Sequence, residues 1–99
     1  MNMFIGYARF DFLVPGSDSL KDKRRIVRRI VERMRARFHV SVAEVDHLDL
    51  HQRSAVGASC VSNSHSHARQ MLDELERFVR SEPEIEMVEV LREVVSADA

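Results

Sequence analysis

The residues best suited to chemistry by type and spacing are acids and bases of one short polar segment, with two histidines among them: Glu44, Asp46, His47, Asp49, His51 and Arg53. Alternate carboxylates beside imidazoles can bind a metal ion or exchange protons as general acid and base. Their spacing matches no established zinc or calcium motif. The alternative is a polar hairpin in which Arg53 pairs with Asp46 or Asp49 and fixes the turn. The sequence favours this hairpin, so we expect no metal, no cofactor and no catalytic residue in the segment.

A second chemical signal is the run of bases over Ser19–Arg37. Nine Lys and Arg residues against two acids give this segment a net charge of +7, so the rest of a chain of net charge −1 carries −8. Like-charged pairs four residues apart, such as Arg24 and Arg28, each cost a helix about 0.2–0.5 kcal/mol. Cations in the first turns also oppose the helix dipole. Because folding alone would favour mixed signs, this concentration of charge points to an anionic partner.

The bases expected to contact that partner are those of the first turns: Lys21, Lys23, Arg24, Arg25, Arg28 and Arg29. Lys and Arg would bind phosphates, which position a protein but carry no sequence information. The segment Ser54–Ser62 lacks the aromatic residues on which an RNA-recognition motif stacks bases, so structured RNA is favoured over single strands. The alternative is a solvated helix face, partly paired with acids of the second helix: Asp73, Glu74 and Glu76.

Six elements are expected to position these groups, in the order strand, helix, strand, strand, helix, strand: Met3–Val14, Ser19–Arg37, Phe38–Asp46, Ser54–Ser62, a helix capped by Asn63 or Ser64 and ended at Ser81–Pro83, and Glu84–Val95. The strands show period-two alternation or β-branched runs, and the helices repeat apolar residues every three or four positions. Ser19 and Asp22 have the spacing of a capping box. Gly6 and Ala8 leave room for a helix to pack closely on the first strand.

This order predicts one ferredoxin-like α+β domain over residues 1–99, a two-layer sandwich with both helices on one face of a four-stranded antiparallel sheet. Right-handed crossovers place the first and third strands at its centre. Apolar residues on both faces of the first strand, such as Tyr7 opposite Phe10, further predict a homodimer through the helix-free face.

Two stretches resemble the signature segments of a bacterial family, the YlxP-like proteins: VPGSDSLKDKRR at residues 14–25 and VSVAEVDHLDLHQRSAVGASCVSN at residues 40–63. The resemblance covers nearly the whole chain. Members of that family are commonly encoded among translation and ribosome-maturation genes. The resemblance therefore implies an RNA-related role, with RNA or a ribosomal particle as the partner.

Composition narrows the remaining classes. The single cysteine, Cys60, excludes an intramolecular disulfide and is typical of a reducing compartment. No apolar run approaches the roughly 20 residues that span a bilayer, and the GxSxG and GxxxxGK[ST] motifs are absent. We therefore expect a cytoplasmic, non-enzymatic RNA- or ribosome-associated binding protein. The alternative is a homodimeric structural or regulatory module.

Overall fold

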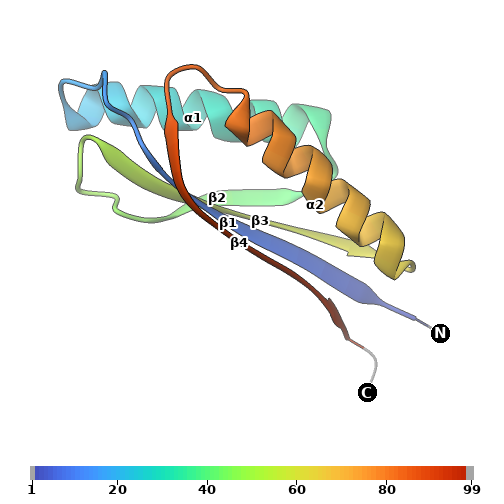
Figure 1. The fold of residues 1–99 in the computed structure, drawn as a ribbon. Coiled ribbons are helices and arrows are strands. Elements are labelled where there is room, and N and C mark those ends of the chain that lie inside the picture. The colour runs from blue at the N-terminus through green and yellow to red at the C-terminus, as the bar shows by residue number, and fades with distance from the viewer. Residues whose placement is uncertain (1, 98–99) are drawn as a thin grey trace.

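The computed structural model describes residues 2–97, so residues 1, 98 and 99 of the predicted domain lie outside it. The elements are β1 (Phe4–Leu13), α1 (Leu20–Arg37), β2 (Ser41–Asp46), β3 (Arg53–Ser62), α2 (His65–Arg80) and β4 (Glu86–Ser96). The strands form one antiparallel sheet in the order β2-β3-β1-β4, and both helices lie on the same face of it (Figure 1). The predicted ferredoxin-like fold, with the first and third strands at the centre, is confirmed.

The core lies between the helices and one face of the sheet. Phe10 and Phe12 of β1 are fully buried there and belong to one core cluster with Ile30 and Met34 of α1 and Leu72 of α2. α1 packs over β2 and β3, whereas α2 packs mainly over β1 and β4. The basic helix is therefore held beside β2, at one edge of the sheet. Within residues 2–97, neither helix is both long and apolar enough to cross a membrane.

The close approach of α2 to β1 depends on Gly6, as the sequence predicts. A Cβ atom at Gly6 would lie 3.0 Å from Cys60 Sγ and 3.4 Å from Leu72 Cγ. Cys60 itself is buried, and this burial raises the pKa of its thiol. Both residues thus serve close packing between strand and helix.

A β-bulge near the end of β2 is the main departure from the expected pattern. The register against β3 shifts between Glu44, which faces Val56, and Asp46, which faces Ala55. A bulge inserts one extra residue, so the two acids no longer share a face as period-two alternation requires. Glu44 lies under α1, while Asp46 lies on the helix-free face. β2 also begins later than expected, at Ser41, because Phe38 instead caps α1 through its N–H bond to the Met34 carbonyl.

Candidate nucleic-acid interface

Lys23 belongs to the buried face of α1. Its side chain is 0% exposed, and its Nζ donates to Glu44 Oε2 at 2.8 Å and to the carbonyl oxygens of His47 at 3.0 Å and Leu48 at 3.3 Å. Glu44 also accepts from Ser54 Oγ at 2.7 Å. The prediction that Lys23 contacts phosphates is therefore wrong, because its ammonium group is bound inside the protein. It ties α1 to β2 and to the turn that follows.

A second side of α1 is paired with acids that follow α2. Arg29 lies 2.5 Å from Glu84 Oε1 and 3.4 Å from Glu82 Oε2, and Arg33 lies 3.2 Å from Glu82 Oε1. The hydrogen bond to Glu84 is the main cause that raises the pKa of Arg29. Arg29 is thus half-buried and paired with acids of the chain, so its charge is less available to a phosphate than the charges of Lys21, Arg24 and Arg28.

Two of the three acids that the solvated-face alternative invoked, Asp73 and Glu76, have other partners. Asp73 and Glu76 bind Arg92 at 2.6 and 3.2 Å, and Glu76 also binds Arg80 at 2.9 Å. These pairs join α2 to β4 and brace α2 itself. They do not reach the basic face of α1.

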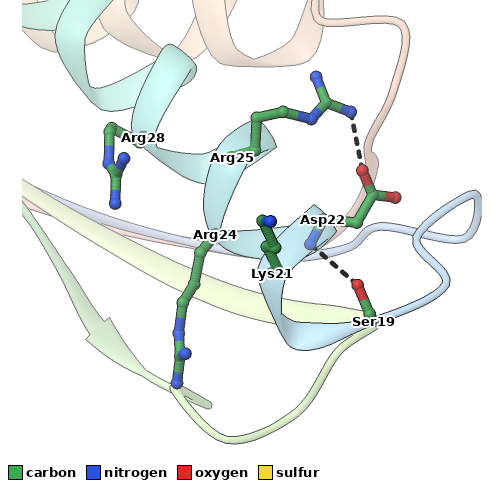
Figure 2. Close-up of a pocket in the computed structure, with 6 residues that line it drawn as sticks. All are labelled: Ser19, Lys21, Asp22, Arg24, Arg25 and Arg28. Atoms are coloured by element: carbon green, nitrogen blue, oxygen red, sulfur yellow. Dashed lines mark hydrogen bonds and ion pairs between the residues drawn. The ribbon is translucent and has the colours of Figure 1, made fainter.

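The third side of α1 carries the exposed bases Lys21, Arg24 and Arg28, which have no acidic partner within 4.0 Å among residues 2–97. Figure 2 shows Arg24 and Arg28 extending to the same side of the helix, while Arg25 turns away to meet Asp22 at 2.8 Å. Lys21, Arg24, Arg25 and Arg28 line a hollow of about 700 Å³. The structure therefore retains four of the six predicted contact residues at an exposed surface.

The first turn of α1 is closed by Ser19, whose hydroxyl accepts from the Asp22 backbone N–H at 3.1 Å. The reciprocal half of the predicted capping box is not formed, since the Asp22 carboxylate accepts from the Asp18 N–H at 3.4 Å instead. The hydrogen bond from Arg25 is the main cause that lowers the pKa of Asp22. Ser19 therefore fixes the helix start that carries the exposed bases.

The predicted polar cluster of the segment 44–53 is divided by the fold. Glu44 lies under α1, Asp46 lies 3.0 Å from Arg9 on the helix-free face, and Asp49 is exposed in the turn. Arg53 pairs with Asp11 rather than with Asp46 or Asp49. Asp46 and Arg53 are therefore joined through Arg9 and Asp11, whereas Glu44 and Asp49 lie apart from them. No group of three His, Cys, Asp or Glu side chains within residues 2–97 is arranged to hold a metal ion.

Asp11 is the centre of a polar network that the sequence analysis did not identify. It lies on the helix-free face of β1, yet it is only 6% exposed. Arg53 Nε and Nη2 donate to its two oxygens at 3.0 and 3.1 Å, His47 Nε2 lies at 3.4 Å and Arg9 Nη2 at 3.7 Å. The backbone of His47 has a positive φ of 59°, which turns residues 47–52 over this end of the sheet. In the sequence, the one indication of this network is the position of Asp11 between Phe10 and Phe12 in an apolar strand.

We expect Asp11 to make the protein less stable in acid. Hydrogen bonds from Arg53, then from His47, hold the pKa of Asp11 below its ordinary value despite desolvation. An unfolded Asp titrates near pH 3.9, so the unfolded state binds more protons below about that pH. The stabilisation is therefore complete above this range and is lost as pH falls through the lowered pKa.

Urea unfolding at pH 7, 4 and 3 measures this effect against Asp11→Asn. At pH 7 the free energy of unfolding of the wild type should exceed that of the variant by about 1–3 kcal/mol. This difference should narrow as the pH falls below 4. A difference of constant size across the three pH values would contradict the assignment.

Comparisons with known proteins cover most of the chain. The profile of a protein family described as "Protein of unknown function (DUF503)" matches residues 5–92. The chain is also 35% identical over 82 residues to "Uncharacterized protein YlxP" of Bacillus subtilis (strain 168), which is 83% of this chain and 89% of that protein. The resemblance to YlxP-like proteins is confirmed. The family match contains the whole of α1, including its exposed bases.

Proposed function

The chain belongs to the DUF503 family, and we propose that it is a non-enzymatic, cytoplasmic protein that binds the phosphate backbone of structured RNA, free or within a ribosomal particle. The contact surface is the exposed basic surface of α1, which we define as Lys21, Arg24, Arg25 and Arg28. The observation that carries the proposal is the exposure of Lys21, Arg24 and Arg28 on one helix without acidic partners in the described part of the chain.

The distribution of acids argues against a merely solvated face. The chain has 16 acids, and it pairs Arg29 and Arg33 with Glu82 and Glu84 on the other side of the same helix. Arg24 and Arg28 stand four residues apart and repel each other at a cost of about 0.2–0.5 kcal/mol. A local cost without a local gain is expected where a surface serves a partner.

Rigid placement supports phosphate binding. Lys23 fixes the same helical turn from below through Glu44 and two backbone carbonyls. The exposed bases next to it are therefore carried on a helix whose position relative to the sheet is set before binding. Preorganised cations lose less entropy on binding than cations on a mobile loop.

The helix-free face gives little support for base stacking. Tyr7 is the one aromatic residue among the exposed large hydrophobic residues of the described chain. Its hydroxyl donates to Glu93 at 2.6 Å. Single-stranded RNA readers use several aromatic side chains and the edges of unstacked bases. Backbone contact with structured RNA therefore suits this surface better.

The proposal is tested by purifying the protein with and without nuclease and by titrating it against ribosomal RNA over a range of salt concentrations. Each neutralised phosphate contributes about 0.7–0.9 to the slope of log K against log salt. If Lys21, Arg24 and Arg28 each contact one phosphate, log K should fall with log salt with a slope of magnitude about two to three. Absence of binding at 50 mM salt, or a slope near zero, would overturn the proposal.

A second candidate is a homodimer through the helix-free face. Tyr7, Val45, Val61 and Leu91 are between 43% and 65% exposed. Tyr7 and Val45 also line a shallow hollow of about 450 Å³ with Gly57 on the same face. The two candidates are compatible, because the basic surface lies on the other layer of the fold.

Light scattering tests the homodimer. We expect twice the chain mass of 11.4 kDa at tens of micromolar, and a single chain mass for Val61→Glu combined with Leu91→Lys, since charges on the apolar face would oppose its burial. A wild type that scatters as a single chain would rule the dimer out.

A further inference from the structure

A groove runs between α1 and the edge strand β2. Its volume is about 370 Å³, and it is lined by Arg24, Val27, Arg28, Val31, Arg35, Ala43 and Glu44. Val27 and Val31 are nearly buried, at 3% and 8% exposure, and belong to the core. The groove is thus lined both by apolar residues, two of which belong to the core, and by three arginines.

Among the three arginines of the groove, Arg35 is neither one of the six phosphate-contacting bases predicted from the sequence nor part of the basic surface defined above. Its Nη2 donates to the Val42 carbonyl oxygen at 2.6 Å. Val42 belongs to β2, so this bond holds the guanidinium against the edge of the sheet. No acid lies within 4.0 Å of it among residues 2–97. Arg35 is therefore fixed in place but not neutralised.

The three arginines form a line. A helix turns by about 100° and rises about 1.5 Å per residue, so Arg24, Arg28 and Arg35 leave α1 within about 40° of one another and span about 16 Å along it. Arg33 leaves the helix on the other side, where it meets Glu82. The positive charge of this part of α1 is therefore directed along the groove.

The one acid in the groove does not cancel this charge. Glu44 binds the Lys23 ammonium at 2.8 Å and accepts from Ser54. Both partners are fully buried. Lys23 matches the charge of Glu44, so the groove retains the charges of its three arginines.

We propose that the α1–β2 groove holds one stretch of RNA backbone and that Arg35 is a phosphate-binding residue together with Arg24 and Arg28. This inference rests on the proposed function and gives it a path, from the first turns of α1 along β2. A guanidinium matches the geometry of phosphate oxygens and remains charged at all relevant pH values. The exposed Ala43, beside the nearly buried Val27 and Val31, supplies apolar contact area for a sugar between phosphates.

Two matched variants test the role of Arg35. Arg35→Gln and Arg33→Gln each remove one positive charge from α1, two residues apart and on different sides. Against ribosomal RNA at 0.1 M salt, Arg35→Gln should weaken binding roughly five- to eightfold and lower the salt slope by about 0.7–0.9. Arg33→Gln should stay within about twofold of the wild type, since surface charge alone acts weakly at this salt concentration.

The outcomes separate this inference from the proposed function. Equal losses of RNA affinity for Arg35→Gln and Arg33→Gln would contradict RNA binding in the groove, because they would show only a diffuse attraction to positive charge. Wild-type binding by Arg35→Gln, with loss on removing Arg24 and Arg28, would overturn the inference but leave the proposed function standing. Wild-type binding by every variant would overturn both.

A second measurement does not depend on the variants folding. Phenylglyoxal modifies accessible arginines of the wild-type protein, and mass spectrometry locates the modified sites. Bound ribosomal RNA should protect Arg24, Arg28 and Arg35, while Arg33 should react as it does without RNA. Equal reactivity of Arg35 with and without RNA would contradict the inference.

Discussion

Replacing Lys23 by alanine is expected to destabilise the protein by about 3–5 kcal/mol, the cost of leaving one partner of a buried ion pair without the other. The Lys23 side chain is fully enclosed, and the Glu44 carboxylate that it binds is only 17% exposed. The substitution also removes the donor to the His47 and Leu48 carbonyls. Urea or guanidinium unfolding measures the change directly.

The neighbouring residue provides the control. Arg24→Ala removes a cation of the same helical turn that is exposed, so the free energy of unfolding should change by no more than about 0.5 kcal/mol. Lys23→Met combined with Glu44→Gln removes both charges and keeps an acceptor for Ser54, and should recover about half of the loss. If Lys23→Ala costs less than about 1 kcal/mol, the buried pair does not hold α1 in place.

The fold was predictable because each element carries its own apolar period. β1 alternates, and the buried residues of α1 recur at helical spacing up to Met34. The position of Lys23 was also contained in that period, since it stands three residues before Ile26 and seven before Ile30. The sequence prediction nevertheless placed Lys23 among the exposed bases, because lysine is almost never fully buried without a partner. That partner, Glu44, lies 21 positions away in the chain.

The rest of the site depends on contacts that sequence periodicity does not contain. The bulge in β2 separates Glu44 from Asp46, and no residue type marks its position. Arg53 finds Asp11, 42 positions away, because β1 and β3 pair antiparallel. The division of α1 into paired and unpaired sides likewise depends on where residues 82–84 return to the helix.

Removing the charges of Arg24 and Arg28 is expected to weaken binding to ribosomal RNA roughly 25- to 60-fold at 0.1 M salt, the combined effect of two lost phosphate contacts. The variant Arg24→Gln with Arg28→Gln should also lower the slope of log K against log salt by about 1.4–1.8. Its stability should match the wild type, because both residues are exposed and their mutual repulsion is removed. Fluorescence anisotropy with labelled RNA and thermal melting measure the two quantities.

The most direct test compares this double variant with Arg29→Gln combined with Arg33→Gln, which removes the same charge from the acid-paired side of the same helix. The salt dependence of RNA binding is measured for both proteins, each checked to be folded by circular dichroism. We predict a flattened slope and a large loss of affinity for the first variant, and a slope like that of the wild type for the second. Equal slopes and affinities for the two variants would show that net charge determines RNA binding. That result would contradict a defined RNA-binding surface on α1.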